Sequence, residues 1–453
     1  MKPKTENRFV RVALALALAS FNLQLSTASA APTVTAVAAG LRHTLVLESD
    51  GSLWAMGNNG AGQLGDGTTT DRHVPTLIVR SNVVAIAAGE YHSLFLTANS
   101  NLWAFGGNAN GELGDGTTTD QHSPEQITFT GGVTAISAGA LHSLFLKGNA
   151  LWGMGWNGYG QLGTGNSVDV HGASQLVSSN VYLISAGYEH SLYETTDGSL
   201  WAMGQNMFGE LGDGTQNTQY TPEEVLTNHS VFTGVYAISA GFVDSLYLYG
   251  SFVLGVGVWG MGYNYAGELG DGTTTERNSP VETVSSGGSA VACGFGVSLL
   301  LKSDGSLWQT ENDVWTEIVS SNVTAMTLGY DGRILYIQSD GSLWGMGNNY
   351  YGQLGDGTTN NAAQFERIIP PLQFVVTNLT VSAGTNLVFS GLNEFGVGTT
   401  VILSSTNVAT PLIQWTPVWT NGIGPGAFSL TATNVVDPAL PQQFFRLKLF
   451  QVL

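Results

Sequence analysis

Four histidines recur at one position of a repeated pattern, where an imidazole could serve as a general acid or base or bind a metal. They are His43, His92, His142 and His190. A catalytic histidine is needed once in an active site, whereas these four follow one another at intervals of 49, 50 and 48 residues. None stands in a metal-binding spacing such as His-Glu-x-x-His. We therefore expect each ring to close a local hydrogen bond between strands or between repeated units.

Five aspartates stand in the motif Leu-Gly-Asp-Gly-Thr, whose oxygen atoms could suggest a calcium loop. They are Asp66, Asp115, Asp213, Asp271 and Asp356. Each loop offers a single carboxylate and lacks the alternating acidic spacing of a calcium-binding loop, and Thr164 takes the aspartate position in the third unit. We expect these carboxylates to accept hydrogen bonds from their own turns. We predict no metal site and no cofactor.

Other signals of catalysis are missing from the sequence. It contains no G-x-S-x-G elbow, no Walker loop and no dinucleotide fingerprint in a βαβ context. The single cysteine, Cys293, replaces an alanine at the end of a repeated strand, so we expect it to be buried. These observations predict a binding protein that is not an enzyme.

The histidine and aspartate motifs belong to a repeat marked by seven Leu-Trp pairs. The tryptophans are Trp54, Trp103, Trp152, Trp201, Trp259, Trp308 and Trp344. The first four lie 49 residues apart, and a fixed period in this range indicates one supersecondary unit repeated along the chain. Each unit divides into four short strands, as in residues 83–88, 92–96, 102–106 and a strand after Pro124. Seven such units predict an all-β, seven-bladed propeller.

The order of the motifs within a unit is specific. Ala-Gly-x-x-His-Ser-Leu is followed by Leu-Trp-Ala-Met-Gly and then by Asn-x-x-Gly-Gln-Leu-Gly-Asp-Gly. This order resembles the regulator of chromosome condensation (RCC1-like) repeat family, over residues 35–369. The resemblance also implies a seven-bladed propeller. Within the family, the chain is most similar to the secreted bacterial type, which includes a β-lactamase inhibitor.

Three parts of the chain are expected. Residues 1–30 have a basic start, an apolar run from Val12 to Leu25 and an Ala-Ser-Ala cleavage site, which is typical of a signal peptide. Residues 31–369 are expected to form the propeller, and residues 370–453 a small C-terminal β-sandwich. No segment is long and apolar enough to predict a transmembrane helix. We therefore expect an extracellular or cell-envelope location.

The chain is strongly acidic, with a formal net charge of −19. Removal of residues 1–30 would take away four basic groups and one acidic group, which makes the mature charge −19 − 4 + 1 = −22. An acidic surface repels phosphate backbones, so we expect no nucleic-acid partner. We expect a monomer.

Aromatic residues distinguish one predicted face of the propeller. In a four-stranded meander, the turn between the first and second strands (turn 1–2) and the loop between the third and fourth (loop 3–4) lie on the same face. The aromatic residues predicted there to bind a partner are Tyr91, Trp156, Tyr159, Tyr188, Phe208, Phe242, Tyr263, Tyr265, Tyr330, Tyr350 and Tyr351. We call this predicted surface the aromatic face. The alternative is that the rings fill gaps between blades.

The sequence thus predicts an exported protein that binds another protein through the aromatic face. Inhibition of an enzyme is one form that this binding could take. Aromatic residues with little charge around them are enriched in protein interfaces. They also stack on sugars, so a glycan- or cell-wall-binding module is a second hypothesis. The family resemblance implies a third, regulation by guanine-nucleotide exchange, which the expected export and acidic charge disfavour.

Overall fold

The computed structural model describes residues 32–127, 132–225, 234–251 and 255–368, together with the backbone of six strands between residues 374 and 451. The chain divides into two compact units, Pro32–Pro370 and Pro371–Leu453 with Met1–Ala31. The predicted signal segment, residues 1–30, lies outside the described residues. In the described part of the chain, no helix is long and apolar enough to cross a membrane.

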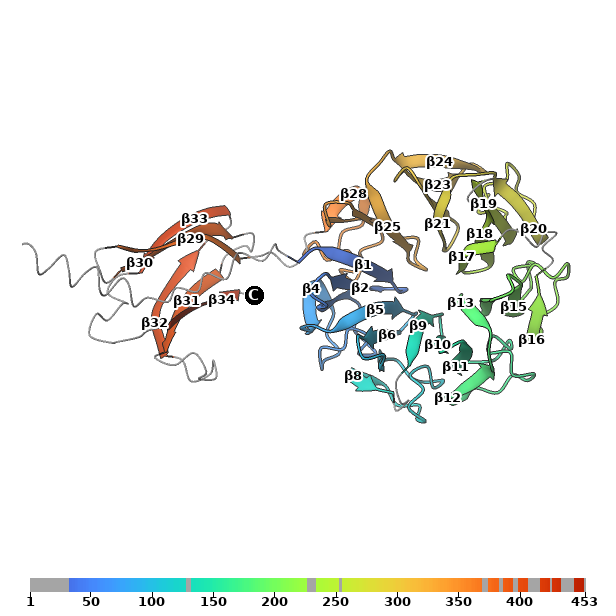
Figure 1. Cartoon of the computed structure of the whole chain (residues 1–453), viewed down its shortest axis with the longest axis horizontal. Helices are drawn as coiled ribbons and strands as arrows, with labels where there is room; N and C mark the ends of the chain where they lie inside the picture. The colour runs from blue at the N-terminus through green and yellow to red at the C-terminus, as the bar shows by residue number, and fades with distance from the viewer. Residues whose placement is uncertain are drawn as a thin grey trace, which may run out of the picture. The chain divides into compact units, whose positions relative to one another are not determined.

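The described strands of the first unit form seven four-stranded antiparallel sheets arranged around a ring (Figure 1). In every sheet the four strands pair in chain order, so each blade is one continuous segment. The ring closes where β1 (Val34–Ala39) packs against β25 (Val323–Leu328) and β26 (Ile334–Gln338). The predicted all-β class and seven-bladed propeller are confirmed.

The strands of the blades follow the repeat. Blades 1 to 3 contain β1, β2 (His43–Glu48), β3 (Leu53–Gly57), β4 (Arg72–Val79), β5 (Val83–Ala88), β6 (His92–Thr97), β7 (Leu102–Gly106), β8 (Gln121–Gln126), β9 (Val133–Ala138), β10 (His142–Lys147), β11 (Ala150–Gly155) and β12 (Val170–Val177). Blades 4 and 5 contain β13 (Val181–Ala186), β14 (His190–Thr195), β15 (Leu200–Gly204), β16 (Gln219–Glu224), β17 (Gly234–Ala240), β18 (Asp244–Ser251), β19 (Gly255–Gly262) and β20 (Arg277–Val284). Blades 6 and 7 contain β21 (Gly288–Cys293), β22 (Ser298–Lys302), β23 (Leu307–Glu311), β24 (Val314–Val319), β25, β26, β27 (Leu343–Gly347) and β28 (Ala362–Ile368).

The fourth strand of the second blade differs from its predicted position. The sequence predicts a strand after Pro124, whereas β8 begins at Gln121 and contains this proline. β8 is the outermost strand of its sheet, and an edge strand tolerates a residue that has no N–H to donate.

The hydrophobic core lies between adjacent blades. Each core cluster of the described residues draws buried side chains from two neighbouring sheets; one cluster, for example, joins Leu94 of blade 2 to Phe145 of blade 3. The repeated tryptophans flank this core as cross-strand partners. Trp103 lies opposite Phe95 in the β6–β7 register, and the two rings stack with centroids 5.8 Å apart. The Leu-Trp pattern is therefore a packing device of the blade.

Blade 6 has no long loop between its third and fourth strands. β23 and β24 are joined by Asn312 and Asp313, whose φ angles of 50° and 65° form a tight hairpin. Its extra tryptophan, Trp315, donates to the hydroxyl of Thr283 in blade 5 at 3.3 Å. This short hairpin leaves the turn 1–2 of blade 6 without the loop 3–4 that lies beside it in other blades.

The strands of the second unit form two three-stranded antiparallel sheets, with orders β29–β30–β33 and β32–β31–β34. This agrees with the predicted β-sandwich. The strands are β29 (Phe374–Ser382), β30 (Asn386–Asn393), β31 (Gly398–Ser405), β32 (Thr416–Ile423), β33 (Gly426–Ala432) and β34 (Phe444–Gln451).

Candidate functional site

The four repeated histidines form hydrogen bonds across the boundaries between blades. Nε2 of each ring lies 2.9 Å from Oγ of a serine in the second strand of the next blade. The pairs are His43–Ser93, His92–Ser143, His142–Ser191 and His190–Ser245. Each serine also donates its hydroxyl hydrogen to a backbone carbonyl of the preceding blade at 2.8 Å. These contacts confirm the structural role predicted for the histidines.

The same contacts determine the protonation state of the rings. Since the single hydroxyl hydrogen of each serine goes to a carbonyl, Nε2 must carry a hydrogen and donate to Oγ. Nδ1 is then an unprotonated acceptor, and in all four rings it has no partner among the described residues. Burial lowers the pKa of His92 to about 4 and the pKa of His43, His142 and His190 to about 3. The four imidazoles are therefore neutral links between blades.

The histidine position changes in blades 5 to 7. In blade 5, Asp244 takes the position, and its Oδ2 accepts a hydrogen bond of 3.2 Å from the hydroxyl of Ser298 in blade 6. In blade 7, Arg333 takes it, and its Nη2 donates to the carbonyl oxygens of Gly40 and His43 at 3.2 and 3.0 Å. A carboxyl group thus joins blade 5 to blade 6, and a guanidinium group joins blade 7 to blade 1. Blade 5 thus places a buried acid where blades 1 to 4 place a neutral ring.

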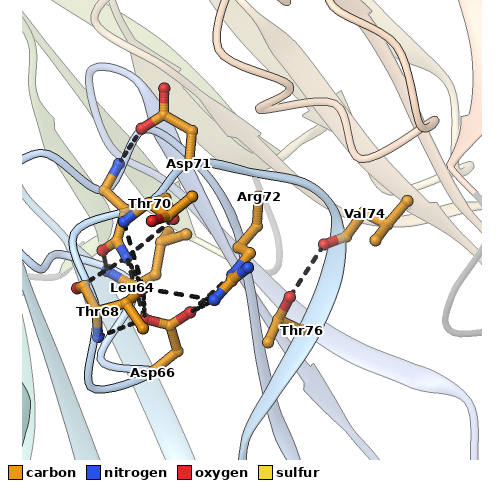
Figure 2. Close-up of polar contacts among 9 residues, drawn as sticks. Leu64, Asp66, Thr68, Thr70, Asp71, Arg72, Val74 and Thr76 are labelled. Atoms are coloured by element: carbon orange, nitrogen blue, oxygen red, sulfur yellow. Dashed lines mark hydrogen bonds and ion pairs between the residues drawn. The ribbon is translucent and has the colours of Figure 1, made fainter. Parts of the chain in front are cut away.

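The repeated aspartates act inside loop 3–4, as predicted. Figure 2 shows Asp66 between Thr68 and Arg72. Oδ1 of Asp66 accepts hydrogen bonds from the backbone N–H and the hydroxyl of Thr68 at 2.9 and 2.7 Å. Oδ2 accepts one from Nε of Arg72 at 2.7 Å. Protein donors thus occupy both oxygen atoms of this carboxylate.

Each of these loops also has a buried asparagine as its hydrogen-bonding centre. The amide of Asn59 donates to Asp66 at 3.1 Å and to the carbonyl oxygens of Thr68 and Thr70, while its Oδ1 accepts from the N–H of Leu64 at 3.0 Å. The same arrangement recurs at Asn108, Asn157, Asn206, Asn264 and Asn349. The loop is therefore rigid, and the side chains it carries are held in fixed positions.

Loop 3–4 also docks on the fourth strand of the next blade. The N–H of Gly67 donates to the carbonyl oxygen of His122 at 2.9 Å, and Gly116 contacts His171 in the same way at 3.0 Å. A Cβ added to Gly62 would lie 2.5 Å from the ring of His122, so glycine is needed at this close approach. His122 and His171 thus belong to the packing between blades.

The predicted aromatic residues of turns 1–2 form a contiguous cluster. The ring of Tyr188 lies 4.1 Å from that of Phe242 and 5.7 Å from that of Tyr330. Phe242 in turn contacts Phe295 at 5.1 Å. Burial and the nearby charge of Glu90 raise the pKa of Tyr188 to about 12. The structure thus brings together turns of blades 4 to 7, which are separated by as many as 142 residues in sequence, from Tyr188 to Tyr330.

The aromatic residues of loops 3–4 form pairs next to this cluster. Centroid distances are 5.5 Å for Trp156–Tyr159 and 5.1 Å for Tyr350–Tyr351. A chain of three rings, Phe208–Tyr263–Tyr265, has distances of 5.0 Å at both steps. Tyr351 accepts a hydrogen bond of 3.2 Å from Arg42. Burial and the charge of Glu90 raise the pKa of Tyr91, and Tyr351 adds a smaller contribution.

The aromatic rings differ in exposure to solvent. An exposed ring is available to bind a partner, whereas a buried ring fills a gap between blades. Tyr350 is 71% exposed and Tyr265 59%. The other nine are half-buried: Tyr91, Trp156, Tyr159, Tyr188, Phe208, Phe242, Tyr263, Tyr330 and Tyr351. Each of these nine presents part of its surface to solvent and packs with the rest. Phe295, which the sequence also places in a turn 1–2 of this face, is 60% exposed.

A cavity of about 370 Å³ opens on this face between blades 5 and 6. Its aromatic wall consists of Phe208, Phe242, Tyr263 and Phe295, and two acidic residues, Asp244 and Glu268, complete the lining together with small residues. Burial raises the pKa of Asp244 to about 8, and the charge of Glu268 adds to this shift. Sequence reasoning missed the cavity. The signal that could have found it is the replacement of histidine by Asp244 at a repeated position.

Family models match most of the propeller sequence. A model described as the RCC1-like domain matches residues 19–247, which is just over half of the chain. The chain belongs to the RCC1-like family. A second model, the Regulator of chromosome condensation (RCC1) repeat, matches residues 340–388 of this RCC1-like protein. Comparison with curated protein sequences finds no match.

Solved structures share the RCC1-like fold. Human WBSCR16 has a TM-score of 0.63 and 20% identity, with 72% of this chain and 95% of that chain covered. Prp20p from Saccharomyces cerevisiae has a TM-score of 0.56 and 21% identity, with 65% and 80% covered, and its structure is described together with its binding to Gsp1p and histones. At these identities the similarity shows the fold of this RCC1-like chain.

Proposed function

We propose that this RCC1-like protein binds another protein through the aromatic face and is not an enzyme. The observation that carries the proposal is the continuous set of partly exposed rings across turns 1–2 and loops 3–4 of blades 4 to 7. Rings with few rotamers lose little conformational entropy on binding, and such residues dominate binding energy at protein interfaces. The hydrogen-bonded loops beneath them provide a preorganised surface.

We further propose that the signal segment, residues 1–30, is removed on export, that residues 31–369 act as the binding domain and that residues 370–453 form a separate C-terminal domain. The partner is then an extracellular or cell-envelope protein, and inhibition of an enzyme is one consequence of such binding. The basis is the N-terminal sequence and the resemblance to secreted bacterial members of the family. The acidic charge also favours a protein partner over nucleic acid.

The test is affinity capture with residues 31–453 as bait against an extracellular and envelope extract. A second bait carries Tyr265→Ala and Tyr350→Ala, because these two rings are the most exposed of the predicted set. A matched control bait carries Tyr182→Ala, since Tyr182 is also exposed, at 65%, but lies at the other end of its strand from turn 1–2.

A protein captured by the unchanged and control baits, but not by the double variant, supports the proposal. Capture that is unaffected by the double variant contradicts it. Retention of the bait on polysaccharide, with release by soluble sugar, would instead support glycan binding. Accelerated nucleotide release from a GTPase would support exchange activity, the alternative that the family resemblance implies.

A further inference from the structure

Cavity formation between blades 5 and 6 follows from a local break in the repeat. Blades 1 to 4 each have a buried histidine at this position. At the boundary between blades 4 and 5, His190 and Ala240, which ends the first strand of blade 5, both lie beside Gly187. At the next boundary the corresponding residues are Asp244 and Cys293, both in contact with the space beside Gly241. A carboxyl group is smaller than an imidazole. The exchange therefore leaves space and introduces an acid at the same place.

Asp244 has unused hydrogen-bonding capacity. The residue is 1% exposed, its Oδ2 accepts from Ser298, and its Oδ1 has no partner among the described residues. The thiol of Cys293, which lies beside it, interacts weakly with this carboxyl group, but its hydrogen bond goes to the carbonyl oxygen of Ser239 at 3.4 Å. A buried acceptor without a donor is unfavourable unless a ligand satisfies it. Since Asp244 lines the cavity, a donor that enters the cavity can reach this part of the wall.

The rest of the lining has the composition of a cation site. Four rings surround the space: Phe208, Phe242, Tyr263 and Phe295. An aromatic face attracts a cation through its quadrupole, and more strongly where water is excluded. The carboxylate of Glu268 also lines the cavity, and one of its oxygen atoms is held by the N–H of Ala266 at 3.0 Å. A cavity of about 370 Å³ falls within the usual size of a small-ligand site.

From this juxtaposition we propose that the cavity between blades 5 and 6 receives a basic side chain, lysine or arginine, from the protein partner. The proposal rests on the proposed function of the aromatic face, because the cavity opens there. The rings of Phe208, Phe242 and Phe295 contact the aliphatic part and the cationic group, and the carboxyl groups of Asp244 and Glu268 accept hydrogen bonds from it. Charge complementarity supports this occupant, since the residues that line the cavity include two acidic side chains and no basic one.

Occupation by a cation also changes the protonation of Asp244. Burial raises the pKa of this carboxyl to about 8, so it holds a proton near neutral pH when the cavity is empty. The titratable groups that face it are the carboxyl of Glu268 and the thiol of Cys293. A positive ligand favours the ionised carboxylate. Binding at pH 7 should therefore release a proton, which titration calorimetry in buffers of different ionisation enthalpy detects.

The binding test uses the full chain and three blocked pentapeptides with lysine, arginine or norleucine at the centre of Gly-Gly-x-Gly-Gly. Chemical shifts of labelled phenylalanine are followed during titration. Norleucine has the apolar length of lysine without its charge. We expect at least one basic peptide to bind on the order of 10-fold more tightly than the norleucine peptide.

Two variants remove charge with little change of shape. Glu268→Gln copies the glutamine that three other blades carry at this loop position, where its Oε1 accepts the same backbone hydrogen bond. Asp244→Asn keeps the size of the side chain. Each should weaken the basic peptide several-fold and leave the norleucine peptide unchanged. The double variant Asp244→His with Cys293→Ala rebuilds the boundary of blades 1 to 4, and it should abolish binding while the protein remains folded.

Three results would overturn the proposal: equal affinity for the basic and norleucine peptides, no binding of any peptide, or unchanged affinity in both charge variants. Binding of butylammonium without binding of either basic peptide would assign the site to a free amine and overturn the protein partner. The proposed function is judged separately. The double variant Tyr265→Ala, Tyr350→Ala could abolish capture of a partner while Glu268→Gln and Asp244→Asn leave it unchanged. That result would support protein binding by the aromatic face and contradict the cavity proposal.

Discussion

Nε2 of His92 in blade 2 donates to the hydroxyl of Ser143 in blade 3 across 2.9 Å. The hydroxyl of Ser143 in turn donates a hydrogen bond of 2.8 Å to the carbonyl oxygen of Glu112, in loop 3–4 of blade 2. One hydroxyl group thus fixes two elements of the neighbouring blade. Since the arrangement repeats at four boundaries, the loops that carry the aromatic face are positioned by the propeller core.

Substitution of Ser143 by alanine should be strongly destabilising, although it removes only one hydroxyl group. It leaves the N–H of His92 and the carbonyl of Glu112 buried without a partner, so we expect the free energy of unfolding to fall by about 2 kcal/mol or more. Urea denaturation provides the measurement. Ser178→Ala is the control, because Ser178 is exposed, and it should change the free energy by less than about 0.5 kcal/mol. Equal effects of the two variants would show that the relay does not stabilise the fold.

The buried histidines should make the protein sensitive to acid. The folded-state pKa of His142 is about 3, below its ordinary value of 6.5, because burial disfavours the charged ring. The unfolded state therefore binds a proton below pH 6.5 that the folded state rejects, and stability falls from pH 6.5 down to about pH 3. Buried acids titrate in the same range, so the informative quantity is a difference between variants. His142→Gln should reduce the slope of unfolding free energy against pH between 4 and 6 by up to about 1.4 kcal/mol per pH unit. An unchanged slope would mean that His142 titrates normally.

The repeat makes much of the structure predictable from sequence, and its exceptions account for what was missed. A residue that recurs at one position in several blades reports packing, so the propeller and the roles of His92 and Asp66 could be inferred from periodicity. A cavity depends on a difference in side-chain volume at one boundary. The sequence shows Asp244 in place of histidine, but the space beside it forms only where blades 5 and 6 are in contact. The exposure of a ring such as Tyr350 also depends on its neighbours in space, which sequence spacing does not specify.

The aspartate loops should tolerate substitution unequally. Asp66→Thr copies Thr164 of blade 3, where the hydroxyl accepts the amide hydrogen of the local asparagine at 2.9 Å. In blade 1, however, Asp66 also pairs with Arg72, which would lose its partner. In blade 2, Asp115 interacts instead with the neutral Gln121. We expect Asp66→Thr to lower the free energy of unfolding by about 1 kcal/mol more than Asp115→Thr, as measured by urea denaturation. The reverse order would contradict a role for the Asp66–Arg72 pair.

Exposed and packed rings of the aromatic face should separate in stability measurements. Tyr350 is 71% exposed, so Tyr350→Ala should change the free energy of unfolding by less than about 0.5 kcal/mol. Tyr188 packs on Phe242 and Tyr330, so Tyr188→Ala should cost about 2 kcal/mol or more. Thermal and urea unfolding of both variants check this. A large loss for Tyr350→Ala would mean that even this ring fills a structural gap, and it would weaken the case for a binding surface.

Asp244 should make the protein less stable as pH rises, in contrast to most carboxylates. Its folded-state pKa of about 8 lies above the ordinary value of 3.8 because of burial, with Glu268 as a second cause. The folded state therefore keeps a proton that the unfolded state releases, and the stability associated with this group is complete below pH 3.8 and is lost progressively up to pH 8. Asp244→Asn removes this dependence, so its stability relative to the unchanged protein should increase between pH 4 and 8.

The matched comparison is Asp197→Asn. Asp197 is an exposed turn aspartate whose pKa is lowered by hydrogen bonds from Thr195 and Ser199. Its ionised form stabilises the fold, so the stability that Asp197→Asn loses relative to the unchanged protein should grow as pH rises through the folded-state pKa to 3.8, and stay constant at higher pH. The two substitutions remove the same charge from the same residue type, yet their effects on unfolding free energy should have opposite signs. If both variants respond to pH in the same direction, Asp244 is not the buried, protonated acid on which the cation site depends.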